Sequence, residues 1–415
     1  MKTHYLIVAA LFAATMTFAQ TTAPKPEAKP AAKRTAEQVH RSALVIDTHE
    51  DTPQRYVDEH FDLADPLNGG QLNLDAIHKG NLGASFMSIW VEPTIYKGHY
   101  ARRTLELIDA SRTQAARHPG EIKFAVSAAD IEAAHREHKY AMLMGIEGGH
   151  SIEDSLALLR MYYVLGVRYM TLTWSNSNGW ADSSGDDKDT TVPHTKEGLS
   201  EFGKDVVYEM NRLGMMVDIS HVSDKTFYRT LVITRAPVIA SHSAARALCD
   251  APRNMTDDML RALAAKGGVV HINYYEGFLD SGFQERQAAL KDEMTQQDAI
   301  DESTPKFGDR TQNGPAVRKI NAARLAKLGR IPLSELLDHF EHAVKIAGID
   351  HVGLGSDFDG VDDMLPEGME DISRMPNLVR GLMERGFSDD DILKILGGNT
   401  LRVMREVEQA AKRAK

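Results

Sequence analysis

The sequence predicts an α/β protein, a single (β/α)8 TIM-type barrel with an insertion after strand 7. From Thr35 onward, short apolar segments rich in β-branched residues alternate with amphipathic helical segments, as in repeated βα units. Eight such units follow one another without a linker-like break, which favours a barrel over a doubly wound sheet. The length of 415 residues and the 42% hydrophobic content fit one large domain of this kind.

The predicted strands are short apolar runs bounded by turn residues. A further weak strand at Ile122–Ala125 is the main risk to a count of eight. In chain order the eight are Leu44–Ile46, Ala84–Val91, Ala141–Ile146, Tyr169–Thr173, Met216–Ser220, Val238–Ser241, Gly268–Ile272 and Val352–Ser356.

Helices between the strands are predicted from apolar residues at three- and four-residue spacing and from glycine stops. Leu199–Leu213 ends at Gly214, Asp257–Ala265 at Gly267, and Leu333–Ala347 at Gly348. Residues 276–330, after the seventh strand, are charged and weakly periodic, so we expect an insertion with helical pieces. On a barrel, such a loop lies over the active-site face, where it is either a lid or a surface embellishment.

The N-terminus is typical of an exported protein. Lys2 precedes an apolar run from Leu6 to Ala14, and Thr17-Phe-Ala19 forms a cleavage site, so residues 1–19 read as a signal peptide rather than a buried helix. Residues 20–34, rich in Pro, Ala and Lys, read as a flexible tether. We therefore expect an exported, periplasmic enzyme without a membrane anchor, whose hydrolase domain spans residues 35–415.

The net charge limits the classes of binding partner, and the cysteine content limits the disulfides that the chain can form. The net charge of −11 disfavours nucleic acid or an anionic membrane surface and suits divalent cations. Cys249 is the only cysteine, so no intramolecular disulfide can form, and we expect it to be an inert packed residue.

Histidines and carboxylates recur where the predicted strands end. One such residue is more often structural, but several converging on one barrel mouth would repel or be desolvated unless a divalent metal neutralised them. The candidates are His49 and Asp51 after the first strand, Glu147 after the third, His221 after the fifth, His242 after the sixth and Asp357 after the eighth.

Nitrogen and oxygen ligands without thiolate select zinc or another late divalent metal. The His49-x-Asp51 spacing places two side chains on one side of an extended segment, where they can clasp one ion. Three imidazoles and two carboxylates exceed what one catalytic zinc accepts, so we expect two Zn²⁺ ions per chain, bridged by Glu147 and a water. Two ions about 3.5 Å apart convert that water to hydroxide and polarise a substrate carbonyl.

Amide hydrolysis also needs a group that takes a proton and returns it to the leaving nitrogen. Asp357 is the candidate for this role. Asp359, two residues farther along, is more consistent with a helix cap or a supporting group.

Ten motifs in order resemble the renal (membrane) dipeptidases and their bacterial relatives in the amidohydrolase superfamily, from Leu44 to Val403. They are Asp47–Asp51, Gly145–His150, Arg168–Thr173, Gly198–Gly203, Met210–Gly214, Val217–Ser223, Ser241–Arg246, Arg253-Asn254, Val352–Gly360 and Gly397–Met404.

The resemblance implies the same metal ligands, with His49 and Asp51 on one zinc, His221 and His242 on the other, and Glu147 between them. It also implies that Asp357 handles the proton and that Arg253 grips the substrate's terminal carboxylate, which suits a planar guanidinium. The well-studied dipeptidases have histidine where this chain has Trp174, and indole cannot carry a proton, so we expect a shifted substrate preference. Relatives also suggest a homodimer.

The leading hypothesis is therefore a zinc-dependent dipeptidase that hydrolyses small dipeptides through a metal-bridging hydroxide. The alternative enzyme is an amidohydrolase acting on a lactone, cyclic amide or N-acyl amino acid, because Trp174 in place of the histidine is compatible with such a substrate. A non-catalytic metal- or peptide-binding protein is the third hypothesis, and the retained Asp357 argues against it.

Overall fold

The computed structural model describes Met1 and residues 34–195, 197–303 and 313–413. One compact unit spans Thr35–Lys415. The expected signal peptide and tether lie outside the described residues, apart from Met1 and Arg34. No helix in the described ranges is both long enough and apolar enough to cross a bilayer.

The strands form a closed parallel barrel, which confirms the predicted fold. The ring runs β1-β2-β4-β5-β6-β7-β8-β9 and closes where Asp47 of β1 pairs with Leu354 of β9. The strands are β1 (Val45–Glu50), β2 (Leu82–Trp90), β3 (Ile122–Phe124), β4 (Tyr140–Glu147), β5 (Val167–Thr171), β6 (Met216–Asp218), β7 (Val238–Ser243), β8 (Val269–Ile272) and β9 (Val352–Leu354).

Helices surround the ring. In chain order they are α1 (Ala36–Ser42), α2 (Pro53–Asp58), α3 (Leu74–Lys79), α4 (Tyr100–Arg117), α5 (Ala128–Arg136), α6 (Leu156–Val164), α7 (Glu201–Leu213), α8 (Asp224–Ile233), α9 (Asp257–Ala265), α10 (Glu276–Leu279), α11 (Phe283–Gln287), α12 (Lys291–Ser303), α13 (Asn313–Leu328), α14 (Leu333–Ala347), α15 (Met375–Glu384), α16 (Asp389–Leu393) and α17 (Asn399–Arg413).

The helix boundaries follow local signals. Side chains of Ser200 and Thr256 cap the first turns of α7 and α9, and α7 ends at Gly214, whose φ of 84° suits glycine. The predicted carboxyl ends of α7, α9 and α14 match the structure, and their predicted amino ends lie within two residues of the observed ones.

Two strands differ most from the sequence prediction, and the bounds of the others agree with it to within two residues. The weak segment at Ile122 is a strand, but it stays outside the ring. It pairs with Tyr140–Met142 of β4, while β5 pairs with β4 only from Met144 onward. The first predicted strand, Leu44–Ile46, is too short, because the polar residues that follow continue β1 to Glu50 and are buried.

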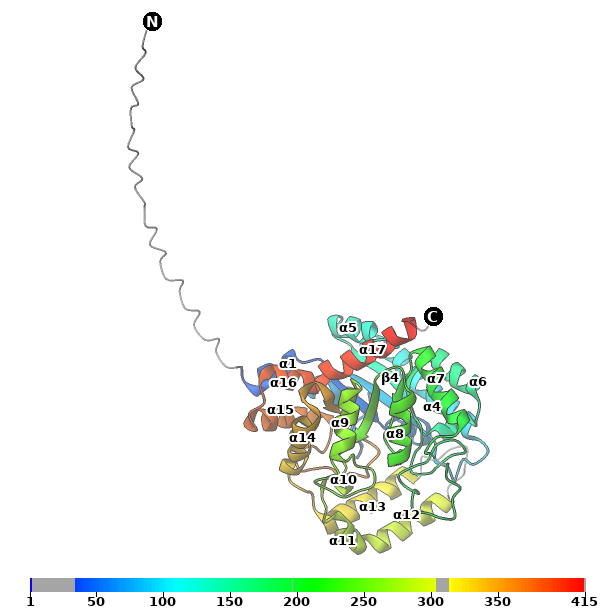
Figure 1. The fold of residues 1–415 in the computed structure, drawn as a ribbon. Coiled ribbons are helices and arrows are strands. Elements are labelled where there is room, and N and C mark those ends of the chain that lie inside the picture. The colour runs from blue at the N-terminus through cyan, green and yellow to red at the C-terminus, as the bar shows by residue number, and fades with distance from the viewer. Residues whose placement is uncertain (2–33, 196, 304–312, 414–415) are drawn as a thin grey trace. The chain divides into compact units, whose positions relative to one another are not determined.

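The core has two main parts and a small third cluster of Phe283, Leu290 and Met364. One fills the barrel interior with residues such as Phe86, Tyr169 and Ile239, and it extends to α5 and α17. Figure 1 shows these two helices together at one end of the barrel, opposite α11, α12 and α13. The other part lies between the strands and the outer helices. Cys249 is buried, and burial raises the pKa of its thiol to about 11, as expected for a packed residue.

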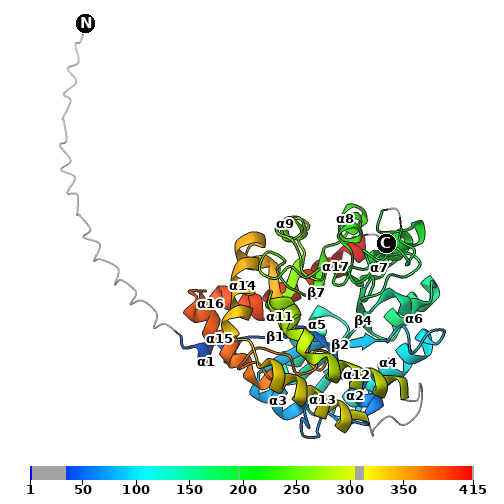
Figure 2. The ribbon, with the colours of Figure 1, turned by 90° about the horizontal axis from the view of Figure 1, so that it is seen from below.

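The insertion after β8 is helical, as predicted, and comprises α10 to α13 where it is described. It lies beside the segments that follow β1 and β9: Arg318 of α13 pairs with Glu59, just after α2, at 3.0 Å, and Arg324 pairs with Asp362, in the loop after β9, at 2.7 Å. Figure 2, viewed from the opposite end to α17, shows α12 and α13 on the side of α2 and α4, away from α7 and α8.

Candidate metal centre

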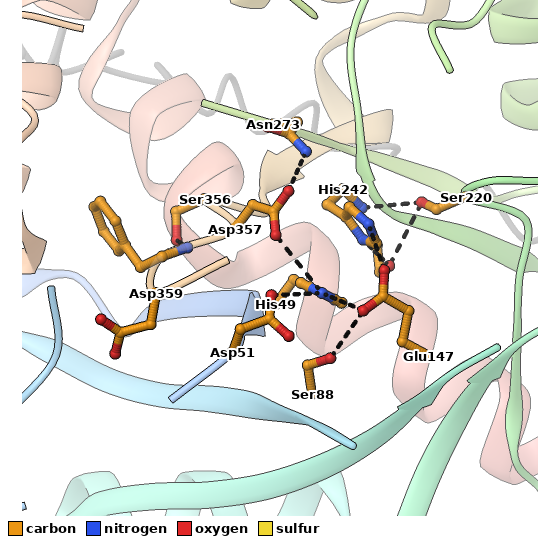
Figure 3. Close-up of polar contacts among 12 residues, drawn as sticks. His49, Asp51, Ser88, Glu147, Ser220, His242, Asn273, Ser356, Asp357 and Asp359 are labelled. Atoms are coloured by element: carbon orange, nitrogen blue, oxygen red, sulfur yellow. Dashed lines mark hydrogen bonds and ion pairs between the residues drawn. The ribbon is translucent and has the colours of Figure 1, made fainter. Parts of the chain in front are cut away.

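Six of the predicted side chains meet at the carboxyl ends of the barrel strands. They come from five separate strands or the turns that follow them, and Figure 3 shows most of them around His49. The set comprises His49, Asp51, Glu147, His221, His242 and Asp357, each of them almost fully buried except Asp357, whose side chain is 13% exposed.

Glu147 occupies the middle of the cluster, with its two carboxylate oxygens turned to different histidines. Its Oε1 lies 2.8 Å from Nε2 of His221 and 3.3 Å from Nε2 of His242. Its Oε2 lies 3.4 Å from Nε2 of His49 and accepts a hydrogen bond from Ser88 at 3.1 Å. One carboxylate therefore faces two groups of nitrogen ligands at once (Figure 3).

The donor set fits divalent metal ions. The Nε2 atoms of His221 and His242 are 2.9 Å apart, although each neutral ring has only one hydrogen to share. Nε2 of His49 and Oδ1 of Asp51 are buried and have no hydrogen-bond partner, although His49 lies 3.4 Å from Oδ2 of Asp51. Converging lone pairs of this kind are costly unless a cation binds them. Ligand atoms form two close groups, His49–Glu147–His242 and His49–Asp51–Asp357.

Burial favours the neutral form of two histidines. It lowers the pKa of His221 to about 3, with the nearby Arg253 guanidinium adding to the shift. It also places the pKa of His242 well below its usual range. Neutral imidazole is the form that binds a metal ion, so the environment holds both rings ready for one.

Backbone conformation brings the side chains inward at two positions. His221 and Asp357 have φ values of 65° and 67°, in the left-handed region. Such a conformation costs a residue other than glycine about 1–3 kcal/mol and is concentrated at functional sites. Gly360 makes room beside Asp357, because a Cβ there would overlap Oδ2 of Asp51 and lie 2.7 Å from Oδ1 of Asp357.

We expect Gly360→Ala to leave the barrel folded but to weaken divalent-metal binding by roughly 10–100-fold, because the added methyl group displaces the carboxylates of Asp51 and Asp357. Metal titration of the stripped protein measures this. Gly120→Ala is the matched control, since Gly120 is exposed and its Cβ would meet nothing within 4 Å. Unchanged metal affinity in Gly360→Ala would show that the carboxylates tolerate the displacement.

Asp357 is oriented by a residue that the sequence analysis did not identify. Nδ2 of Asn273, just after β8, donates to Oδ2 of Asp357 at 2.8 Å, leaving Oδ1 3.8 Å from Nε2 of His49. Burial raises the pKa of Asp357, and the carboxylates of Asp51 and Glu147 act in the same direction against His49. A carboxyl group with a raised pKa can exchange a proton near neutral pH.

Asp359 points away from the centre, as Figure 3 shows. Its carboxylate accepts from the Thr52 hydroxyl at 2.6 Å and from the Gln71 backbone at 2.7 Å. It therefore fixes the turn after β1, which agrees with the expected supporting role.

Arg253 reaches the same mouth from the turn after β7. Its Nη2 donates to the carbonyl of His242 at 3.0 Å, while its buried Nε has no hydrogen-bond partner. Burial lowers the pKa of Arg253 to about 10, which Asp357 and Glu147 oppose, so the guanidinium stays cationic at neutral pH. It can offer hydrogen bonds to an anionic group close to the metal ligands.

Trp174 forms an aromatic wall with a residue that the sequence analysis did not single out. The Trp174 ring lies 5.0 Å from the Trp90 ring and 6.2 Å from the His221 ring, measured between centroids. Both tryptophans are partly exposed. Trp180 and Tyr274 are 1% and 0% exposed and belong to the core.

Three supporting residues were not identified from the sequence, because two are ordinary strand residues and the third, Asn273, is a single polar residue after a strand. Ser88 reaches Glu147 from β2, Asn273 reaches Asp357, and the hydroxyl of Tyr169 lies 2.9 Å from Nδ1 of His49. Only Asn273 had a usable signal, because it is polar and directly follows a predicted strand.

Known proteins are similar to this chain in sequence and in fold. The family model Membrane dipeptidase (Peptidase family M19) matches residues 33–415. An uncharacterized dipeptidase of Schizosaccharomyces pombe is 34% identical over 93% of this chain and 85% of its own length, and human Dipeptidase 3 is 34% identical over 90% and 67%. The crystal structure of the probable dipeptidase PvdM from Pseudomonas aeruginosa superposes with a TM-score of 0.77 at 28% identity, covering 91% of this chain and 98% of that one.

Proposed function

Since the chain belongs to the membrane dipeptidase family and is a metallo-dipeptidase, we propose that it hydrolyses small dipeptides with two zinc ions held at the barrel mouth. The observation that carries this proposal is the position of Glu147, whose two oxygens face His49 on one side and His221 with His242 on the other. A carboxylate divided in this way suits a bridge between two ions.

The ligands divide into two sets that share Glu147. His49 and Asp51 would hold one ion, and His221 and His242 the other. Oxygen and nitrogen donors without sulfur, in a buried site, suit zinc. Bound there, divalent ions would lower the pKa of a water and polarise the scissile carbonyl.

The proton transfer is assigned to Asp357. Its Oδ1 faces the ligand cluster and its Oδ2 is held by Asn273, so the carboxylate is fixed on the side where a nucleophilic water would approach. Asp357 would accept the proton of that water and return it to the leaving nitrogen, which would otherwise depart as an unstable amide anion.

Arg253 would bind the substrate's terminal carboxylate. Its guanidinium is cationic, has an unpartnered Nε, and is anchored to the carbonyl of His242, one of the proposed ligands. A dipeptide carboxylate bound there would place the scissile bond over the metal ligands.

We expect Arg253→Met to weaken dipeptide binding in the transition state by roughly 2–4 kcal/mol, the scale for removing one partner of a desolvated charge pair. Dipeptide amides should be poor substrates and little affected. Comparing kcat/KM for acids and amides measures this. Arg261→Met is the matched control, because Arg261 lies on α9 and pairs with Asp258 at 2.9 Å. Equal losses for acids and amides would make Arg253 structural.

Trp174 is proposed to set the preference among dipeptides. We expect Trp174→His to change the ranking of dipeptides by about tenfold in kcat/KM, equivalent to 1.4 kcal/mol, because it adds a polar contact near the scissile carbonyl. A dipeptide panel run on the parent and the variant at equal metal content measures the change. An unchanged ranking would remove Trp174 from the specificity assignment.

The reaction itself is tested with a panel of dipeptides, including D-residues at the C-terminal position, beside N-acyl amino acids, lactones and cyclic amides. Release of two amino acids from a dipeptide, with the other compounds slow, is the expected result. Preference for a lactone, cyclic amide or N-acyl amino acid would instead favour the alternative amidohydrolase.

Export to the periplasm is also proposed, from the apolar run and cleavage site in residues 1–19. N-terminal sequencing of the protein recovered from a bacterial periplasmic fraction should begin at Gln20. Recovery of the full-length chain from the cytoplasm would contradict export.

A further inference from the structure

A buried chain of hydrogen bonds leads from Asp218, at the end of β6, to His242. The Asp218 carboxylate is fully buried and accepts four hydrogen bonds. Its Oδ1 accepts from the backbone of Ser220 at 3.0 Å and of Ser241 at 2.8 Å. Its Oδ2 accepts from the hydroxyls of Thr171 and, at 2.6 Å, of Ser241. The Ser241 Oγ in turn lies 2.7 Å from Nδ1 of His242.

The donor and the acceptor of each hydrogen bond between Asp218, Ser241 and His242 follow from the chemistry of the groups. A carboxylate has no hydrogen to donate, so the Ser241 hydroxyl gives its single hydrogen to Asp218. The Ser241 oxygen can then only accept at its other contact, so the hydrogen between Ser241 and His242 belongs to Nδ1 of the imidazole. In a neutral ring this leaves the lone pair on Nε2, the atom 3.3 Å from Oε1 of Glu147.

We infer that Asp218 is a positioning residue that acts through Ser241 to hold His242 in the Nδ1–H tautomer, with Nε2 free to bind a metal ion. This inference rests on the proposed metal site. It assigns a function to Asp218, which lies outside the proposed ligand set.

The other two histidines lack an equivalent constraint. Nδ1 of His49 lies 2.9 Å from the Tyr169 hydroxyl, which can either donate or accept. Nδ1 of His221 lies 3.4 Å from the hydroxyl of Ser175, a longer contact. The tautomer is therefore imposed from outside at His242, and loss of Asp218 should affect the ion held by His221 and His242 rather than the ion held by His49 and Asp51.

The decisive variant is Asp218→Asn, which keeps the size of the side chain but can reverse the direction of the hydrogen bonds that lead to His242. The amide Nδ2 would donate to the Ser241 oxygen, whose hydrogen would then turn toward Nδ1 of His242 and move the imidazole hydrogen to Nε2. Ser241→Ala is the second variant. It removes the link while leaving Asp218 three donors, so it stays informative if Asp218→Asn does not fold. Thr171→Val is the matched control, because it removes a hydroxyl from Oδ2 but leaves the link to His242 intact.

Two measurements on the full chain test the inference. Nitrogen-15 NMR of histidine-labelled, metal-free protein reports the tautomer of His242, and zinc titration of the same samples reports the affinity of each ion. We expect Nδ1–H in the parent and in Thr171→Val. We expect loss of that tautomer in Asp218→Asn and Ser241→Ala, with the second ion weakened about 10–100-fold and the first changed less than about twofold.

An Nε2–H tautomer in the parent would overturn the inference, as would parent-like zinc binding in both Asp218→Asn and Ser241→Ala. If the parent bound no zinc, the proposed function would fail, and the NMR spectrum of metal-free protein would still decide the tautomer. Weakening of both ions to the same extent would also count against the inference, because it would show a general structural role for Asp218.

Discussion

Replacing Glu147 by alanine is expected to reduce bound zinc from two ions per chain to one or none and to abolish dipeptide hydrolysis. The reason is that both oxygens of Glu147 face ligand histidines, so one substitution removes a donor from each half of the site. Elemental analysis of the purified variant, beside a dipeptide assay, measures both effects.

The matched control for this variant is Glu276→Gln. Glu276 is also a fully buried glutamate, but its carboxylate accepts from the backbone of Ile331 at the base of the insertion. The Glu276→Gln variant should retain two ions and dipeptidase activity. Two firmly bound ions in Glu147→Ala would contradict the bridging role, and full activity with a single ion in the parent would contradict the binuclear mechanism.

Asp357→Asn is expected to keep the fold and both ions while lowering kcat by roughly 10²–10⁴-fold, the range for loss of a general acid–base group. The asparagine can still accept from Asn273 through its carbonyl oxygen, which turns its NH₂ group toward the centre, where it cannot take a proton. Steady-state kinetics at verified metal content measures the loss.

Asp359→Asn is the matched control, because Asp359 lies on the same loop but is bound to Thr52 and Gln71. The Asp359→Asn variant should retain most of the parent's kcat. Near-normal turnover in Asp357→Asn would move the proton transfer to another group. Loss of one ion from Asp357→Asn would instead make Asp357 a ligand, a role that its grouping with His49 and Asp51 permits.

The sequence was sufficient to predict the barrel because parallel strands buried on both faces read as continuous apolar runs. The prediction was less accurate where this signal is absent. Polar residues from Asp47 to Glu50 read as a loop, yet they extend β1, since the barrel mouth buries them and pairs Glu50 with Met87 of β2. Membership of the short strand β3 in the ring depends on where β5 begins to pair with β4, which no local pattern encodes.

The site was predicted from one rule, that ligands in such barrels come from the ends of strands. The rule selects His49, Glu147, His221 and His242, which the structure brings together. It cannot select the residues that orient them. Asp218 and Ser241 are small polar strand residues, and their contacts to the site depend on the register between neighbouring strands.

We propose that dipeptide hydrolysis requires two zinc ions at the mouth of the barrel. The most direct measurement strips the protein with a chelator, returns zinc in fractional steps, and records bound metal and dipeptide turnover in the same samples. We expect no turnover in the stripped protein and full turnover at two ions per chain. Turnover without metal, or full turnover at one ion, would contradict a requirement for two ions.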